Sequence, residues 1–341
     1  MPTAQLYDLA DALYRLAPWK WLHEDQLIGL RHPVTGELAH ISIMGALDEH
    51  RALALYLGED ALHRFNLQQN EEYLYDLSKE DGVQLTLEAR QLKVSFEERP
   101  NLAKSELAEI KAMGRKYRGR NYPIFRSFHP GRCPGFINEA EAEWLIYAME
   151  QVIEVAPNLA NDDMADLRED EKNNLEAITR EFRDGNWHTT WLPLDERTYV
   201  IPSPDPDPAL VAALLQYRPD LELECQFQLL ANPIGLDRHN AVFPYSIMSV
   251  HAESGFVFGL DLLTVEKQSH EELVASVPDC FLHQWIKQGI RPAAIYVATH
   301  GTHEILLKVA DALDVPLVRE PKLPALNKAF HSAMSFINRG L

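Results

Sequence analysis

Residues 294–319 read AIYVATHGTHEILLKVADALDVPLVR, and this stretch decides the fold of the C-terminal part of the chain. The apolar run 294–298 predicts a strand, the stretch 302–313 predicts a helix, and 315–319 predicts a second strand. Two strands of one sheet that are joined through a helix run parallel. We therefore expect a parallel strand pair in the C-terminal sheet.

The residues around this stretch complete a larger α/β pattern. Strands are expected at 222–230, 241–251 and 255–264, with the second and third close enough to form a hairpin. A helix at 269–289 follows, and a last helix is expected at 324–337. The order β-β-β-α-β-α-β-α predicts an α/β C-terminal domain with a mixed sheet of about five strands.

The first half of the chain mixes helices and strands without regular alternation. Leu6, Leu9, Leu13 and Leu16 recur at helical spacing, and Pro18 ends that helix. Further elements are expected in this order: strands at 26–31, 38–45 and 51–57, a helix at 59–69, one or two strands at 83–96, a helix at 104–117, a strand at 123–128 and a helix from Asn138. This pattern predicts an α+β N-terminal domain.

The length of 341 residues is typical of two domains. Residues 160–185 are rich in acids and are interpreted as a solvated helix or connector. Four prolines between 202 and 208 mark an extended segment that neither a helix nor a sheet accommodates. We place the boundary between domains of residues 1–185 and 186–341.

Composition and charge exclude some broad classes. The hydrophobic fraction of 46% and the charged fraction of 24% are those of a globular protein, not of a disordered or fibrous chain. The formal net charge is −19. Because phosphate binding needs clustered cations, this charge disfavours a whole-protein preference for nucleic acid or anionic membranes.

Cellular location and cofactors are inferred from absent patterns. The three cysteines are Cys133, Cys225 and Cys280, and none forms a CxxC pair, which favours reduced thiols. No signal peptide is recognised at the N-terminus, and no apolar run approaches the length of a membrane span. We expect a cytoplasmic protein without membrane association. No nucleotide-binding or hydrolase motif occurs, and no cofactor is evident, although a divalent metal ion is compatible with the residues discussed below.

A basic island, residues 110–138, contrasts with the acidic chain around it. It contains no Asp or Glu, and its basic residues are Lys111, Arg115, Lys116, Arg118, Arg120, Arg126 and Arg132. Aromatic residues are interleaved, a combination that single-stranded nucleic acid requires. We name Arg115, Arg118, Arg120, Arg126 and Arg132 as candidate anion-binding residues. The alternatives are pairing with the acids of 139–171 and contact with a protein partner, including a second copy of the chain.

The segment 299–304 reads THGTHE and lies where a strand turns into a helix. Ligands of parallel α/β sheets bind at such strand ends. His300 and His303 are therefore candidate metal ligands, with His251 and His239 as further candidates by residue type alone. The alternative is a helix start capped by Thr302 with two exposed histidines.

Four segments resemble an uncharacterised bacterial two-domain family. They are 17–21 (APWKW), 118–135 (RGRNYPIFRSFHPGRCPG), 289–292 (GIRP) and 322–326 (KLPAL). The resemblance covers most of the chain. It implies a two-domain architecture and no particular chemistry.

The element order of residues 222–337 is similar to the ribonuclease-H-like fold. That resemblance implies metal-binding carboxylates on the first strand, on the first helix and at the end of the fourth strand. Here the first strand offers Glu222 and Glu224, the first helix offers Glu271 or Glu272, the third strand carries Asp261, and the fourth strand ends near His300 without an acid. Glu224, Asp261 and His300 are the candidate catalytic groups.

Two hypotheses about function follow, and the sequence leaves open whether the protein is an enzyme. The first is a non-enzymatic cytosolic binding or adaptor protein whose second domain lacks the acids of an active site. The second is a metal-dependent phosphodiesterase or nucleic-acid-processing protein that uses a degenerate ribonuclease-H-like domain. Convergence of Glu224, Asp261 and His300 in one pocket would favour the second.

Overall fold

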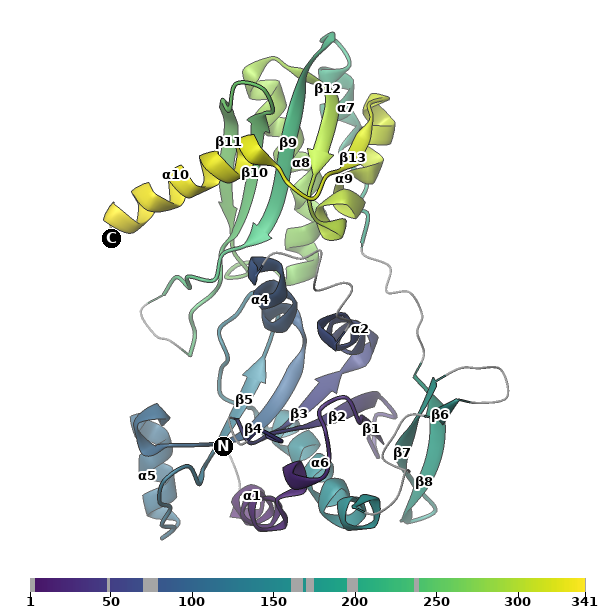
Figure 1. The fold of residues 1–341 in the computed structure, drawn as a ribbon, viewed down its shortest axis with the longest axis vertical. Helices are drawn as coiled ribbons and strands as arrows, with labels where there is room; N and C mark the ends of the chain where they lie inside the picture. The colour runs from purple at the N-terminus through teal and green to yellow at the C-terminus, as the bar shows by residue number, and fades with distance from the viewer. Residues whose placement is uncertain are drawn as a thin grey trace. The chain divides into compact units, whose positions relative to one another are not determined.

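The computed structural model describes residues 4–47, 50–69, 79–160, 168–169, 175–194, 202–235 and 239–340 (Figure 1). The chain divides into two compact units, which we call unit 1 and unit 2. Unit 1 comprises Met1–Asn70, Leu85–Pro130 and Pro134–Tyr199, and unit 2 comprises Glu71–Gln84, Gly131–Cys133 and Val200–Leu341. Within the described residues, no helix has the length and apolar character that a membrane crossing requires.

Unit 1 is built on a mixed sheet with the strand order β5-β4-β3-β2-β1-β7-β6, and β8 also pairs with β7. Strands β1 and β7 run parallel, and the other pairs are antiparallel. The elements are α1 (Ala4–Leu16), a 3-10 turn (Pro18–Lys20), β1 (Ile28–Arg31), β2 (Leu38–Met44), β3 (Ala52–Leu57), α2 (Gly58–Gln69), α4 (Lys79–Glu88, which begins in unit 2), β4 (Gln91–Glu97), a second 3-10 turn (Arg99–Asn101), α5 (Lys104–Ala112), β5 (Tyr122–Phe128), α6 (Glu139–Leu159), β6 (Arg168–Glu169), β7 (Leu175–Arg183) and β8 (Asn186–Pro193).

Alternation along the strands gives this sheet two apolar faces. Ile41 and Ile43 of β2 join the main core, which α1 and α6 cover, whereas Tyr56 of β3 packs with Leu62 and Phe65 of α2 (Figure 1). Helix α6 begins with a capping box. The Asn138 side chain accepts a hydrogen bond from the Glu141 backbone, and the Glu141 side chain accepts one from the Asn138 backbone.

Unit 2 contains a five-stranded mixed sheet with the order β11-β10-β9-β12-β13. Strands β9, β12 and β13 run parallel, which confirms the expected parallel pair, and β10 is antiparallel to both of its neighbours. The elements are α7 (Pro208–Leu214), β9 (Pro219–Leu229), β10 (Tyr245–His251), β11 (Val257–Leu263), α8 (His270–Gln288), β12 (Arg291–Val297), α9 (His300–Leu313), β13 (Leu317–Arg319) and α10 (Pro324–Gly340).

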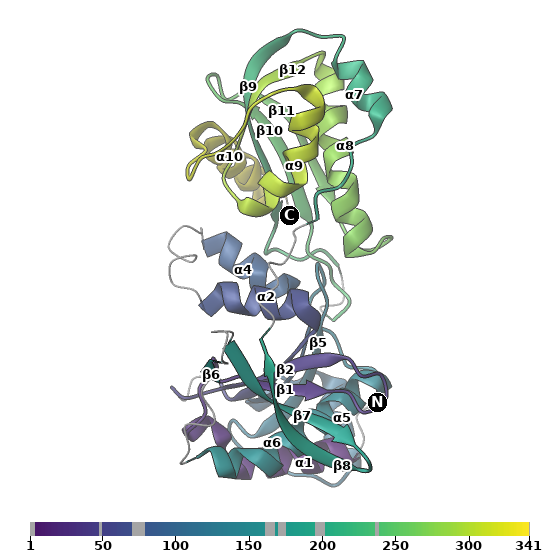
Figure 2. The same cartoon turned by 90° about the vertical axis from the view of Figure 1, so that its right-hand side faces the viewer.

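The two faces of this sheet are covered by different helices. Gln284 of α8 bonds to Ser249 on one face, while Leu326 of α10 packs with Met248 and Val250 on the other. Helix α9 packs beside α8 (Figure 2). Side chains that point to opposite faces of the sheet therefore contact different helices.

Three expectations need correction. Residues 83–88 belong to helix α4. Strand β4 begins only at Gln91, which pairs with Tyr56 near the end of β3. The part of 160–185 that is described holds β6 and β7, with 161–167 and 170–174 outside the described residues. Residue 185 lies in the turn that joins β7 to β8, so the boundary moves from 185 to the end of unit 1 at Tyr199.

Candidate metal centre

The turn from β12 into α9 is fixed by two threonines. The Thr299 side chain caps the helix and accepts a hydrogen bond from the Thr302 backbone N–H at 3.1 Å, so Thr299 is the cap that the sequence analysis assigned to Thr302. Thr302 is buried. Its Oγ1 accepts from the Phe227 backbone N–H and donates to the Phe227 carbonyl, both at 3.3 Å. The first turn of α9 is thus attached to the central strand β9.

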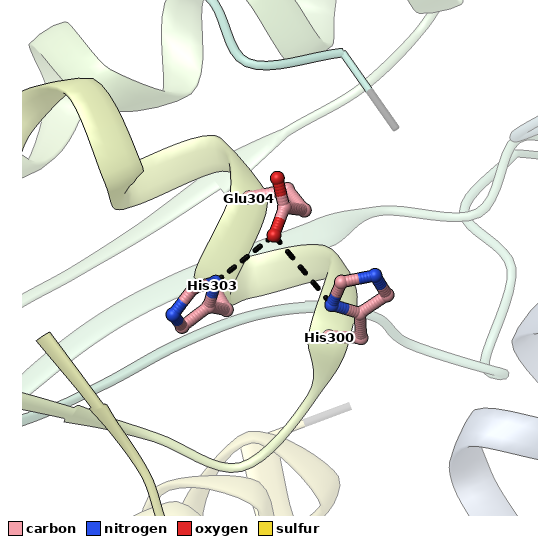
Figure 3. A group of neighbouring side chains, drawn as sticks. All are labelled: His300, His303 and Glu304. Atoms are coloured by element: carbon pink, nitrogen blue, oxygen red, sulfur yellow. Dashed lines mark hydrogen bonds and ion pairs between the residues drawn. The ribbon is translucent and has the colours of Figure 1, made fainter. Parts of the chain in front are cut away.

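This turn brings together His300, His303 and Glu304, which we call the His300 cluster (Figure 3). The Oε1 atom of Glu304 lies 3.0 Å from Nδ1 of His303 and 3.6 Å from Nδ1 of His300. One candidate ligand atom from each residue lies within 4.8 Å of the others. The spacing i, i+3, i+4 places the three side chains on one face of the helix.

The distances suit a tetrahedral metal ion. Two ligands that sit about 2.1 Å from such a zinc ion lie roughly 3.4 Å apart. The two measured nitrogen–oxygen distances, 3.0 and 3.6 Å, fall on either side of that value. The side chains are 46%, 24% and 24% exposed for His300, His303 and Glu304, so a further ligand can reach the site from solvent.

The electrostatic surroundings favour a neutral imidazole. Burial lowers the pKa of His300, and the charges of Arg319 and His303 act in the same direction, whereas Glu304 raises it. His300 is therefore neutral at pH 7 and keeps a nitrogen lone pair for a ligand. Sequence reasoning identified both histidines but missed Glu304. The available signal was its position four residues after His300.

Glu224 and Asp261 do not join this cluster. Glu224 lies on β9, where its Oε2 accepts a hydrogen bond from the Leu326 backbone N–H of α10 at 2.6 Å. Asp261 lies on β11, where its Oδ2 accepts one from Nε2 of Gln284 on α8 at 2.8 Å. Since α10 and α8 cover opposite faces, the two carboxylates cannot hold one metal ion. The convergence expected of an active site is not found.

The two additional histidines also lie elsewhere. His251 ends β10, and its Nδ1 lies 2.7 Å from Oγ of Ser254 in the turn toward β11. His239 lies in the turn that precedes β10. Neither belongs to the His300 cluster.

Comparison with models of protein families shows which family the chain belongs to. Residues 4–182, more than half of the chain, match a model described as a domain of unknown function, DUF7309. The chain belongs to the DUF7309 family. Residues 212–334 match a second domain of unknown function, DUF6930, which confirms the expected uncharacterised two-domain family. No curated protein and no solved structure matches the chain, so the ribonuclease-H-like resemblance stays a prediction.

In the DUF7309 domain, much of the basic island is paired with acids of the same unit. The ion pairs are Arg115 with Asp8 and Asp11 at 2.6 and 2.8 Å, Arg126 with Glu106 at 2.6 Å, and Arg120 with Glu98 at 3.3 Å. These acids precede the island, whereas the sequence analysis placed the pairing acids in 139–171. The positive charge of these three arginines, which binding to nucleic-acid phosphates would require, is therefore already paired with carboxylates of the chain.

The remaining two candidate arginines differ from each other. Nη2 of Arg132 donates to the Val265 carbonyl at 2.6 Å, and both residues belong to unit 2. Arg118 is exposed, and the described residues give it no ion pair. Whether Arg118 and its neighbours bind an anion or a partner stays a prediction.

The DUF7309 domain also contains a cleft of about 880 Å³ that sequence reasoning missed. Its lining includes Arg90, His129 and Glu141, and Arg90 and Ser127 donate to Glu141 at 2.6 and 2.7 Å. His40 lines the same cleft and is buried, and among the described residues its Nδ1 finds no hydrogen-bond partner. Burial lowers the pKa of His40 to about 4. Of these groups, the sequence indicates only Glu141, which stands three residues after Asn138 at the start of a helix, the spacing of a capping box.

Proposed function

We propose that the protein is a non-enzymatic binding protein whose C-terminal unit holds a divalent transition-metal ion between His300, His303 and Glu304. The observation that carries this proposal is the distance of 3.0 and 3.6 Å from one carboxylate oxygen to the two imidazole nitrogens. Three side chains on one helical turn thus place one ligand atom each within 4.8 Å of the others.

The donor atoms select the class of metal. Two imidazole nitrogens and one carboxylate oxygen suit zinc and its transition-metal neighbours, whereas Mg²⁺ prefers oxygen ligands. We expect zinc to occupy three protein ligands and to leave at least one position open. The partial exposure of the cluster allows water or a side chain of a binding partner to fill that position.

The geometry disfavours the phosphodiesterase alternative. Cleavage of a phosphodiester by two metals needs carboxylates that converge on ions about 4 Å apart. Glu224 and Asp261 instead bond to helices on opposite faces of the sheet. A single metal held by His300, His303 and Glu304 supports binding without supplying that clamp.

Calorimetric titration of the metal-free protein with Zn²⁺ tests the proposal. We expect one ion per chain, and a weaker response to Mg²⁺ at the same concentration. His303→Ala should lower the zinc affinity by at least the roughly 10–100-fold that loss of an outer-shell partner costs. Glu304→Gln should also weaken binding, because the neutral amide is a poorer ligand than the carboxylate.

His331→Ala is the matched control, because His331 is an exposed histidine on α10 of the same unit. It should bind zinc as the unaltered protein does. If His303→Ala and Glu304→Gln bind zinc as tightly as His331→Ala, the ion binds elsewhere and the proposal is wrong. Absence of stoichiometric binding to the unaltered protein would reject it directly.

A further inference from the structure

The cleft of about 880 Å³ in unit 1, which we call the His40 cleft, lies at one end of strands β1 to β5. In the register of the sheet, Arg31 at the end of β1 pairs with Leu38 at the start of β2, and both line the cleft. Arg90, just before β4, and His129, just after β5, line it from the same end. The lining residues that the structure describes all belong to unit 1.

His40 stands at a position of β2 where an apolar side chain is the usual choice. It pairs with Tyr56 of β3, on the side of the sheet that α2 covers. The residue is 5% exposed, and among the described residues its Nδ1 finds no hydrogen-bond partner. Ser42, the next side chain on that side, donates to the Glu24 carbonyl at 2.7 Å. A buried polar group without a partner costs stability, and such exceptions are typical of functional sites.

The imidazole of His40 selects the type of group that it can bind. Burial lowers its pKa to about 4, so the ring is uncharged at pH 7. A neutral imidazole has one N–H donor and one nitrogen acceptor. A hydroxyl or a primary amide can both donate and accept, so it matches either ring nitrogen in either tautomer. A charged group would lose hydration beside a ring that supplies no opposite charge.

The other basic side chains that line the cleft already have carboxylate partners. Arg31 lies 2.8 Å from Glu181, and Arg90 lies 2.6 Å from Glu141. Nε2 of His129 lies 3.3 Å from the same Glu141 oxygen. An anion in the cleft would have to compete with these carboxylates for the cations. The cleft therefore does not favour an anionic occupant.

Much of the remaining wall is apolar. The apolar lining residues are Leu38, Leu57, Leu62, Trp144, Leu192 and Pro193. They stabilise an apolar molecule by removing its surface from water. The volume lies in the upper part of the roughly 300–1,000 Å³ range of small-molecule sites.

We propose that the His40 cleft binds an uncharged amphipathic small molecule, which places a hydroxyl or amide group against His40 and its apolar body against the leucines. The hydrogen bond to His40 fixes the orientation of the molecule, and the apolar wall supplies most of the affinity. This inference is independent of the metal proposal, since the cleft and the His300 cluster belong to different units.

Four probes with one apolar body and different head groups test the inference: phenylbutanol, phenylbutanamide, phenylbutyrate and phenylbutylamine. Calorimetric titration at pH 7 compares their affinities for the unaltered protein. We expect saturable binding of the alcohol or the amide, at least about tenfold tighter than that of either charged probe, because charged groups lose more hydration. A charged probe that binds as tightly as both uncharged ones would overturn the inference. So would the lack of binding of all four probes at millimolar concentration.

Two substitutions of His40 test its role. His40→Phe keeps a ring and removes both nitrogens, and it should lower the affinity for phenylbutanol about tenfold through the lost hydrogen bond. His40→Asn keeps a side chain that donates and accepts, so it should bind phenylbutanol more tightly than His40→Phe does. Urea unfolding without a probe gives a second readout. His40→Phe should unfold at an equal or higher urea concentration than the unaltered protein, because it removes a buried polar group that lacks a partner.

His23→Phe is the matched control, because His23 is an exposed histidine of unit 1 outside the lining of the cleft. It should bind the four probes as the unaltered protein does. Equal affinities of His40→Phe and His23→Phe for phenylbutanol would mean that the imidazole does not contact the molecule. A lower unfolding midpoint of His40→Phe, without recovery of binding in His40→Asn, would mean that His40 has a structural role. Either result rejects the inference.

Discussion

Four donors converge on the carboxylate of Glu141, the residue at which sequence and structure agree only in part. The capping box predicted its bond to Asn138, but not the bonds from Arg90, Ser127 and His129. Burial acts to raise the pKa of Glu141, but these hydrogen bonds and the charge of Arg90 lower it to about 2. The ionised carboxylate is therefore a fixed part of the cleft.

Glu141→Gln should destabilise the protein by about 3 kcal/mol at pH 7, because the neutral amide loses the interactions that depress the pKa. The pKa is lower in the folded state than in the unfolded state. The contribution of Glu141 is therefore complete above about pH 4.5 and is lost as the pH falls toward 2. Urea unfolding at a series of pH values should show the two proteins converging in acid.

Glu139→Gln is the control for this prediction. Glu139 lies in the same helical turn but is exposed. Its loss should cost no more than about 0.5 kcal/mol through the helix dipole. A constant difference between Glu141→Gln and the unaltered protein across the pH range would contradict the assigned role of the charge.

Other residues show where sequence reasoning reaches its limit. His300 and His303 were predictable as a pair, because helical spacing alone places them on one face. Glu224 and Asp261 were not, since their faces depend on the register of β9, β10 and β11. A shift by one residue moves a side chain to the opposite face, and turn lengths in the sequence do not fix that shift.

At the scale of the elements, the turn between β12 and α9 has a role that can be tested, the attachment of α9 to β9 through Thr302. Thr302→Val keeps the side-chain shape and removes the hydroxyl that bonds to both backbone groups of Phe227. Leaving these buried groups without partners should cost about 1–3 kcal/mol. Urea unfolding measures this loss. If the His300 cluster holds zinc, the zinc affinity should fall as well, because the first turn of α9 loses its attachment.

Thr302→Ser supplies the comparison, because serine retains the hydroxyl and loses only a methyl group. It should retain more than half of the stability that Thr302→Val loses. If both variants are destabilised equally, packing of the methyl group matters and the hydroxyl does not attach the helix to β9.

Two elements show why local pattern was insufficient. Residues 83–88 alternate as a strand does, yet β3 ends before it can pair with them, and they form part of α4. The hairpin of β7 and β8 has a sequence signal in the pair Asp184-Gly185, which the sequence analysis did not use. Asp184 and Gly185 both have positive φ angles, as the favoured two-residue hairpin turn requires. The acid-rich composition of 160–185, in contrast, favours a solvated segment over a strand.

At the scale of the whole molecule, unit 2 is not continuous in sequence. The segments Glu71–Gln84 and Gly131–Cys133 belong to it, although its main part begins only at Val200. The backbone N–H of Cys133 donates to the Ala241 carbonyl, and that of Phe243 donates to the Gly131 carbonyl, both at 2.9 Å. A pattern read along the chain cannot find such an inserted segment, because its partners are distant in sequence.

A fragment of residues 202–341 should therefore be less stable than unit 2 in the full chain. It lacks these two hydrogen bonds, the one from Arg132 to the Val265 carbonyl and the one from the Leu229 backbone N–H to Oε1 of Gln84, and the loss should amount to about 4 kcal/mol. Hydrogen exchange read by mass spectrometry over β10 and α8 compares the same peptides in both proteins. We expect faster exchange in the fragment.

Gly131→Ala in the full chain separates this effect from other consequences of truncation. Gly131 has φ 71°, and a Cβ atom there would lie 3.0 Å from Cγ1 of Val265 and 3.1 Å from the Tyr245 ring. The variant disturbs the inserted segment without removing any other part of the chain. It should accelerate exchange in the same β10 peptides as the fragment does. Two results together would contradict the prediction: unchanged exchange in the Gly131→Ala variant, and a fragment that is as protected as the full chain. Unit 2 would then fold without the segment Gly131–Cys133, because water replaces the hydrogen bonds of that segment at no cost.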